Sequence, residues 1–110
     1  MKNYSYINKS KCDIKILEIA KRKGVFFVTL EFKKKYKTSF LDIIIECKLK
    51  NKNFFDSNVL TYESMDILDI RLYKLEKDNN NAIFSNSYER LFFMESLDEE
   101  LRKLKIIIKD

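Results

Sequence analysis

The side chains best suited to chemistry in this sequence are carboxylates that alternate with a lysine along one segment. Asp42, Glu46 and Lys48 share the phase of a strand, so their side chains would project from the same face. Carboxylates can hold a divalent cation while a lysine contacts the scissile phosphate, as in a metal-dependent nuclease. A chain of this composition contains about three acid-x-Lys triplets by chance. It has three, which begin at Asp13, Glu31 and Glu46, so the nuclease is only a weak alternative.

The chain lacks the residues that other common catalytic mechanisms require. The chain has no histidine, the usual general base near neutral pH, and its one glycine cannot form a glycine-rich phosphate loop. The two cysteines, Cys12 and Cys47, are too few to hold zinc, and Cys47 alternates with the apolar Ile43 and Ile45. We interpret both cysteines as unpaired, buried apolar side chains. We therefore predict no catalytic residue, no metal and no cofactor, in a protein that is not an enzyme.

Length and composition predict one folded domain that spans residues 1–110. A chain of 110 residues has a common domain size, and its hydrophobic share of 45% is sufficient for a packed core. The residues after the basic start contain no apolar stretch of the kind found in a signal peptide. The longest apolar run, Leu91-Phe92-Phe93-Met94, is too short to span a bilayer. We expect a cytoplasmic protein without membrane contact.

The charge of the chain is uneven. The net charge is +5, yet lysine supplies 18 of the 22 basic residues, and arginine is the better ligand for phosphates and bases. The abundance of Ile, Lys, Asn, Phe and Tyr is the profile of an AT-rich genome, so codon usage explains part of the basicity. Residues 1–55 carry a net charge of +9 (14 basic, 5 acidic), and residues 56–110 one of −4 (8 basic, 12 acidic). We expect the halves to attract each other within the fold; the alternative is that they face different partners.

The first half of the chain predicts three antiparallel strands. Val25 to Phe32 and Phe40 to Lys50 alternate with the period of two that is typical of half-buried strands. Paired in phase, they place two apolar rows on one face, Phe26/Val28/Leu30/Phe32 and Ile43/Ile45/Cys47. The strand Cys12 to Ala20 changes phase after Ile16, which predicts a bulge. Gly24 predicts a tight turn with positive φ, and residues 33–39 predict a longer charged connection.

The second half is more ambiguous. We predict a loop or short helical turn up to Asp66, a strand from Ile67 to Glu76 and a fifth strand from about Tyr88 to Met94. Ser96 and Glu99 then have the spacing of a capping box, followed by a helical stripe of Leu97, Leu101, Leu104 and Ile108. The predicted fold class is α+β, with a four- or five-stranded, mainly antiparallel meander and a C-terminal helix packed on one face.

Without a catalytic constellation, the favoured function is binding to another protein. We expect an inhibitor, or an immunity or phage anti-defence protein, that blocks the surface of a toxin or nuclease. The number of copies that assemble, a homodimer included, is left open. The predicted partner-binding residues are apolar side chains outside the predicted core and three acids that would form a negative patch for a basic partner: Phe27, Ile44, Phe54, Phe55, Glu63, Asp66 and Asp69.

The alternative function is a small accessory protein that binds nucleic acid through two basic turns. Its candidate contacts are Lys21, Arg22 and Lys23 in the first turn, and Lys33, Lys34, Lys35 and Lys37 in the second. The predicted strand between the turns separates them by about 27 Å. They would therefore not form one patch, which favours the protein-binding function.

Overall fold

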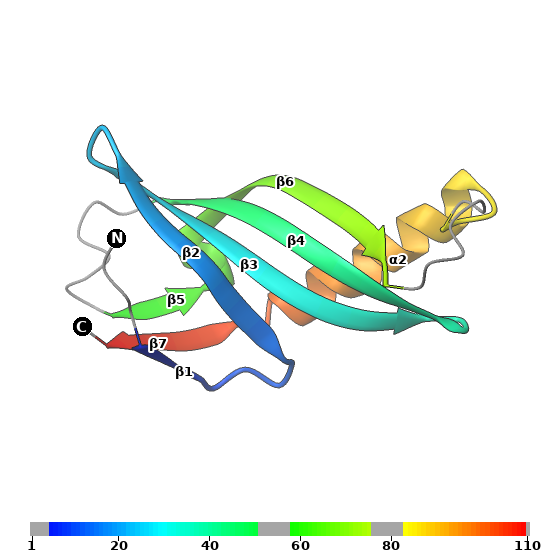
Figure 1. Cartoon of the computed structure of the whole chain (residues 1–110), viewed down its shortest axis with the longest axis horizontal. Helices are drawn as coiled ribbons and strands as arrows, with labels where there is room; N and C mark the ends of the chain where they lie inside the picture. The colour runs from blue at the N-terminus through cyan, green and yellow to red at the C-terminus, as the bar shows by residue number, and fades with distance from the viewer. Residues whose placement is uncertain (1–4, 51–57, 76–82, 110) are drawn as a thin grey trace.

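The computed structural model describes residues 5–50, 58–75 and 83–109, and it shows an α+β fold (Figure 1). A four-stranded and a three-stranded antiparallel sheet are accompanied by the helix α2 (Ser87–Leu101). The predicted fold class is thus confirmed. The predicted single sheet is one part of it, because segments from both ends and from the middle of the chain form the second, smaller sheet.

The larger sheet is a meander in the order β2-β3-β4-β6. Its strands are β2 (Ile14–Arg22), β3 (Val25–Tyr36), β4 (Ser39–Leu49) and β6 (Met65–Lys74). The predicted in-phase pairing is confirmed, since Leu30 pairs with Ile45 and Phe32 with Ile43. These side chains are at most 5% exposed and form the inner face of the sheet. A shift by one residue would bury Asp42 and Glu46 instead.

Two tight turns connect β2 to β3 and β3 to β4. Lys23 and Gly24 both have positive φ, 52° and 79°, as a two-residue turn between twisted strands requires, so the prediction for Gly24 is confirmed. The longer charged connection predicted at residues 33–39 is wrong. Strand β3 continues to Tyr36, which pairs with Ser39, and only Lys37 and Thr38 form the turn. The ladder can extend because residues 34 and 36 keep the inward phase of the strand.

A bulge interrupts each edge strand of the larger sheet. The predicted bulge in β2 lies between Ile16 and Glu18, and a second one in β6 lies opposite Glu46. Both face the cross-strand pair of Thr29 and Glu46 in the two central strands. The extra residues, Leu17 and Leu68, are 48% and 53% exposed. The bulges thus place one leucine of each edge strand in solvent.

The smaller sheet has the order β1-β7-β5 and corrects the prediction for the C-terminus. It consists of β1 (Ser5–Asn8), β5 (Val59–Thr61) and β7 (Lys105–Lys109). The predicted helix does not continue through Ile108, because Ile106, Ile107 and Ile108 favour a strand and alternate between buried and half-buried positions. The 3-10 helix η1 (Tyr62–Ser64) confirms the predicted short helical turn before β6.

Helix α2 begins earlier than predicted. The strand predicted from Tyr88 to Met94 is wrong, and Ser96 lies inside the helix instead of capping it. The N-cap is Asn86, whose side chain accepts a hydrogen bond from the amide of Glu89 (3.0 Å). Glu89 in turn accepts one from the amide of Ser85 (2.9 Å). This pair of contacts satisfies backbone donors at the start of the helix, so nucleation there prevails over the strand-like apolar run.

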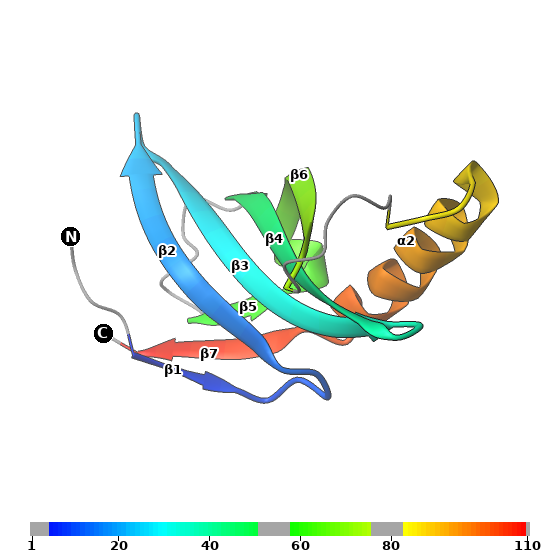
Figure 2. The same ribbon diagram turned by 45° about the vertical axis from the view of Figure 1, so that its right-hand side comes forward.

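The two sheets and the helix enclose one apolar core. Phe93, Leu97 and Leu101 of α2 pack in the same cluster as the inner face of the larger sheet and the buried Leu60 and Ile106 of the smaller one. Figure 2 shows that the N-terminal part of α2 projects away from the smaller sheet. Helix α2 is therefore buried along one side only.

Replacing Gly24 tests the first turn. An added Cβ meets no atom within 4 Å, so Gly24→Ala costs only the strain of a side chain at positive φ, about 1 kcal/mol. We expect that loss in the free energy of unfolding, measured by urea denaturation. Lys23→Ala is the matched control, because Lys23 already carries a Cβ at positive φ. Equal stability of the Gly24→Ala variant and the wild type would contradict the turn geometry.

Candidate protein-binding surface

The carboxylates of the larger sheet do not form a metal site. Glu46 points to the outer face and is paired with Arg71, which also contacts Asp69 (3.2 Å). Asp42 lies on the same face between Lys33 and Tyr73. Within residues 5–50, 58–75 and 83–109, no group of three or more Asp, Glu, Cys or His side chains could hold a metal ion. Glu46 and Asp69 are thus engaged by the guanidinium group of Arg71.

The two cysteines are free thiols in environments that suppress reactivity. Burial raises the pKa of Cys47 to about 12, because the core cannot solvate a thiolate. Burial together with Glu100 and Asp13 also raises the pKa of Cys12, which is half-buried. Both shifts disfavour the thiolate, which is the nucleophilic form of cysteine.

The predicted partner-binding residues do not come together in one cluster. Phe27 and Ile44 are half-buried on the outer face, and the pair Thr29–Glu46 lies between them. Asp69 is paired with Arg71. The remaining members are scattered: Glu63 is exposed in η1, Asp66 pairs with Lys50 at 3.5 Å, and Phe54 and Phe55 lie outside the described residues.

The predicted nucleic-acid residues are divided between the two faces of β3. Lys34 points to the inner side, where it contacts Glu100 (3.0 Å) and the hydroxyl of Ser96 (3.2 Å). Lys37 pairs with Glu89 at 2.8 Å. The other members are exposed, with Lys23 in the first turn and Lys33 on the outer face. The charged groups of Lys21, Arg22 and Lys35 lie over the rings of Phe26, Phe27 and Phe40, respectively. Two lysines are thus neutralised by acids of α2, as attraction between the two halves of the chain predicts.

Contacts along α2 determine which side of the helix faces inward. The rings of Tyr36, Phe84 and Phe93 meet with centroids 5.2 to 5.5 Å apart, which ties the β3–β4 turn to the start of the helix. Further along, the hydroxyl of Tyr62 donates to Asp98 (2.7 Å), which also accepts a hydrogen bond from Arg102 (2.9 Å). The helix is therefore held at both ends.

The opposite side of α2 carries large apolar side chains in solvent. Tyr88 is 73% exposed, Phe92 67% and Leu91 54%. At 100° per residue, these positions lie on the side away from Phe93, Leu97 and Leu101, together with Glu95 and Glu99. We call Tyr88, Leu91, Phe92, Glu95 and Glu99 the α2 outer face.

Sequence reasoning misses this surface because it assigns its first residues to a strand. Two signals point to the helix: Asn86 and Glu89 have the spacing of a cap, and Phe93, Leu97 and Leu101 recur every four residues. Once the helix begins at Ser87, the spacing of Tyr88 and Phe92 places them on a second stripe. That the stripe stays uncovered by the described residues depends on the tertiary structure.

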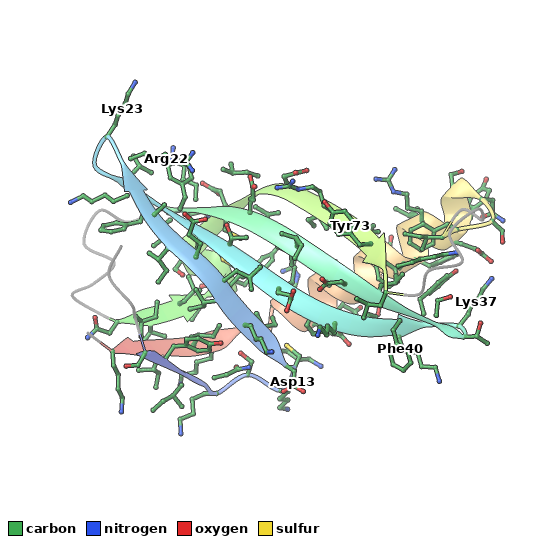
Figure 3. The ribbon with its side chains drawn as sticks, viewed as in Figure 1. Asp13, Arg22, Lys23, Lys37, Phe40 and Tyr73 are labelled. Carbon is green, nitrogen blue, oxygen red and sulfur yellow. The ribbon has the colours of Figure 1, made fainter. Side chains whose placement is uncertain are left out.

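Other exposed apolar side chains lie at the same end of the molecule. The amide of Leu75 donates to the carbonyl of Phe40 (3.0 Å), and the side chains of the two residues are about half exposed. Tyr73 precedes them on β6 and is 48% exposed. Figure 3 shows Phe40 and Tyr73 on the outer face of the larger sheet, in the half that leads to Lys37 and the start of α2. Exposed apolar area is thus concentrated at this end.

Comparisons with known proteins do not assign a function to this surface. The chain matches no family model, no curated protein and no solved structure. None of the helices within the described residues is long and apolar enough to cross a membrane. Function therefore has to be inferred from the geometry of the α2 outer face.

The ion pair at the start of α2 predicts a pH dependence of stability. Hydrogen bonds from Lys37 and from the amide of Ser85 lower the pKa of Glu89 from 4.5 to about 2. Because this pKa is lower in the folded state, the stabilisation is complete above pH 4.5 and is lost as the pH falls toward 2. We expect the melting temperature of the wild type to decrease more between pH 5 and pH 2 than that of Glu89→Gln, as followed by circular dichroism.

Two further variants make this pH experiment specific. Lys37→Met removes the donor of the same ion pair but leaves the hydrogen bond from the amide of Ser85, so it should reduce the pH dependence by less than Glu89→Gln. Glu99→Gln is the control, because Glu99 is exposed and forms no ion pair within the described residues. Parallel curves for the wild type and Glu89→Gln would contradict the role of this pair.

Proposed function

We propose that this protein acts without catalysis of its own, by binding another protein and covering its surface. The observation that carries the proposal is the α2 outer face, where Tyr88, Phe92 and Leu91 are 54% to 73% exposed on a helix whose other side is firmly anchored. Large aromatic side chains are enriched at the centres of protein interfaces, where a few of them supply most of the binding energy. In a protein without a partner, such side chains leave apolar area exposed to water, which is unfavourable and marks an interaction site.

The anchoring of α2 supports this function. The aromatic contacts of Tyr36 and Phe84 with Phe93 and the hydrogen bonds of Asp98 orient the helix within the described structure. A surface that is already ordered loses less conformational entropy on binding than a segment that must fold on its partner. An anchored helix is thus suited to tight occlusion of a partner's surface.

The target class that we propose is a toxin or a nuclease, with this protein as its inhibitor, immunity protein or phage anti-defence protein. Small size and a binding surface without a metal cluster among the described residues suit a protein that acts by occupying a surface. Fold class adds nothing to this assignment, because function depends on the site. Nucleic-acid binding is the competing outcome, and the pairing of Lys34 and Lys37 with Glu100 and Glu89 reduces the charge available for it.

The proposal is tested by capture from the native host followed by reconstitution. The wild type, the double variant Tyr88→Ser/Phe92→Ser and the control Leu68→Ser are used as baits, since Leu68 is 53% exposed on β6. We expect one protein to be captured by the wild type and the control. The purified partner should bind the double variant at least about 100-fold more weakly than it binds the wild type. The wild type and the Leu68→Ser control should each inhibit the activity of the partner, and the double variant should not.

Two results would overturn the proposal. One is a captured protein whose affinity and activity are unaffected by Tyr88→Ser/Phe92→Ser. The other is capture of nucleic acid alone, with a steep salt dependence that charge reversal of Lys21, Arg22, Lys33 and Lys35 abolishes. Circular dichroism of each bait should show the wild-type spectrum, so that loss of binding reports on the surface and not on the fold.

A further inference from the structure

Helix α2 is acidic within a basic protein. Ser87–Leu101 contains five acids and one arginine, a net charge of −4, while the whole chain has +5. Three of these acids have partners on the body of the protein or at the end of the helix: Glu89 with Lys37, Glu100 with Lys34, and Asp98 with Tyr62 and Arg102. Their charge serves to hold the helix.

The other two acids, Glu95 and Glu99, belong to the α2 outer face. Both are exposed, and neither forms an ion pair with any residue in the described part of the chain. They follow the aromatic pair along the same stripe, so the stripe from Tyr88 to Glu99 extends over about 16 Å at 1.5 Å per residue. Its first half is apolar and its second half is negative.

A shallow hollow lies beside the acidic half. Met94, Glu95, Asp98, Glu99 and Arg102 line it, and its volume is about 470 Å³. Three of its five side chains are acids. The carboxylates also lie in the C-terminal half of the helix, where the backbone dipole adds negative potential. Three carboxylates against one guanidinium, that of Arg102, leave the lining net negative, so an entering ammonium or guanidinium group would meet favourable charge.

We propose that the α2 outer face docks onto a partner surface that presents an apolar cleft beside a cluster of lysine or arginine side chains. This inference rests on the proposed function and adds the chemistry of the partner and the orientation of the helix on it. Tyr88 and Phe92 enter the apolar cleft, and Glu95 and Glu99 pair with the basic cluster. The order of the two halves along the stripe sets the direction in which the helix binds.

The charges argue against two other occupants. Phosphates of a nucleic acid would be repelled by Glu95 and Glu99. In a second copy of this chain, a twofold axis parallel to the helices would bring these carboxylates toward their counterparts, and an antiparallel packing would place them against the aromatic half of the copy; in neither arrangement does the α2 outer face supply a basic partner. The chemistry of the face thus favours a different, basic protein.

Two designed peptides probe this chemistry directly, with no need to identify the partner first. One is a 14-residue amphipathic helix of leucine and lysine, and the other has glutamate in place of lysine. Affinities are measured by isothermal titration calorimetry for the whole protein at low salt. We expect the wild type to bind the leucine–lysine peptide at least about tenfold more tightly than the leucine–glutamate peptide.

Charge reversal provides the decisive variant. Glu95→Lys/Glu99→Lys should invert the peptide preference, whereas the control Glu18→Lys, an exposed acid on β2, should leave it unchanged. Tyr88→Ser/Phe92→Ser should weaken both peptides without inverting the preference. An increase from 50 to 500 mM salt should reduce the preference of the wild type, because exposed charges are screened.

The outcomes separate this inference from the proposed function. A wild type that binds both peptides equally, or neither at 1 mM, overturns the basic-partner inference, as does a preference that Glu95→Lys/Glu99→Lys leaves unchanged. If the serine double variant nevertheless loses the captured host protein, the proposed function stands and only the chemistry of the partner is wrong. If Tyr88→Ser/Phe92→Ser still captures that protein while Glu95→Lys/Glu99→Lys inverts the peptide preference, the proposed function fails. The preference of the α2 outer face for basic peptides then remains.

Discussion

The in-phase pairing of β3 and β4 is the constraint on which the rest of the structure depends. Val28, Leu30 and Phe32 face Cys47, Ile45 and Ile43, and all six side chains are at most 5% exposed. Burial of these two rows creates an apolar inner face that other elements must cover, because water cannot solvate it favourably. Helix α2 and the smaller sheet both pack in the resulting core.

The same constraint determines the position of α2. The inner phase of β3 continues beyond the core to Lys34 and Tyr36, and these two residues contact Glu100 and Phe93 of the helix. A strand that ended at Phe32 would have left the start of α2 without these contacts. The extension of β3 thus orients the helix, and the orientation in turn leaves Tyr88 and Phe92 in solvent.

The opposed charges of the two halves of the chain have a structural use. Three ion pairs join a lysine of residues 1–55 to an acid of residues 56–110: Lys34 to Glu100, Lys37 to Glu89, and Lys50 to Asp66. Two of them hold α2 against the turn and strand of the larger sheet. Exposed pairs contribute little stability individually, so their main effect here is to fix the helix in register with β3.

The sequence by itself determined the meander, its inward rows, the first bulge and the turn at Gly24. These features depend on local alternation and on the conformational freedom of glycine, which a single segment displays. It also determined that histidine chemistry and glycine-rich phosphate loops are absent. The sequence predicted the boundaries of α2 only in part, because the apolar run from Leu91 to Met94 fits a strand as well as a helix.

Only the tertiary structure decided the rest. Ile106 to Ile108 have a local preference for a strand, but their place in a sheet depends on β1 and β5, which pair with them on either side although these two segments are far away in the sequence. Phe27 and Ile44 are on one face but separated, since cross-strand neighbours follow from the register. Which stripe of α2 is buried depends on the partners that Phe93 meets in space. An exposed surface is defined by what does not cover it, and no local pattern of residues contains that information.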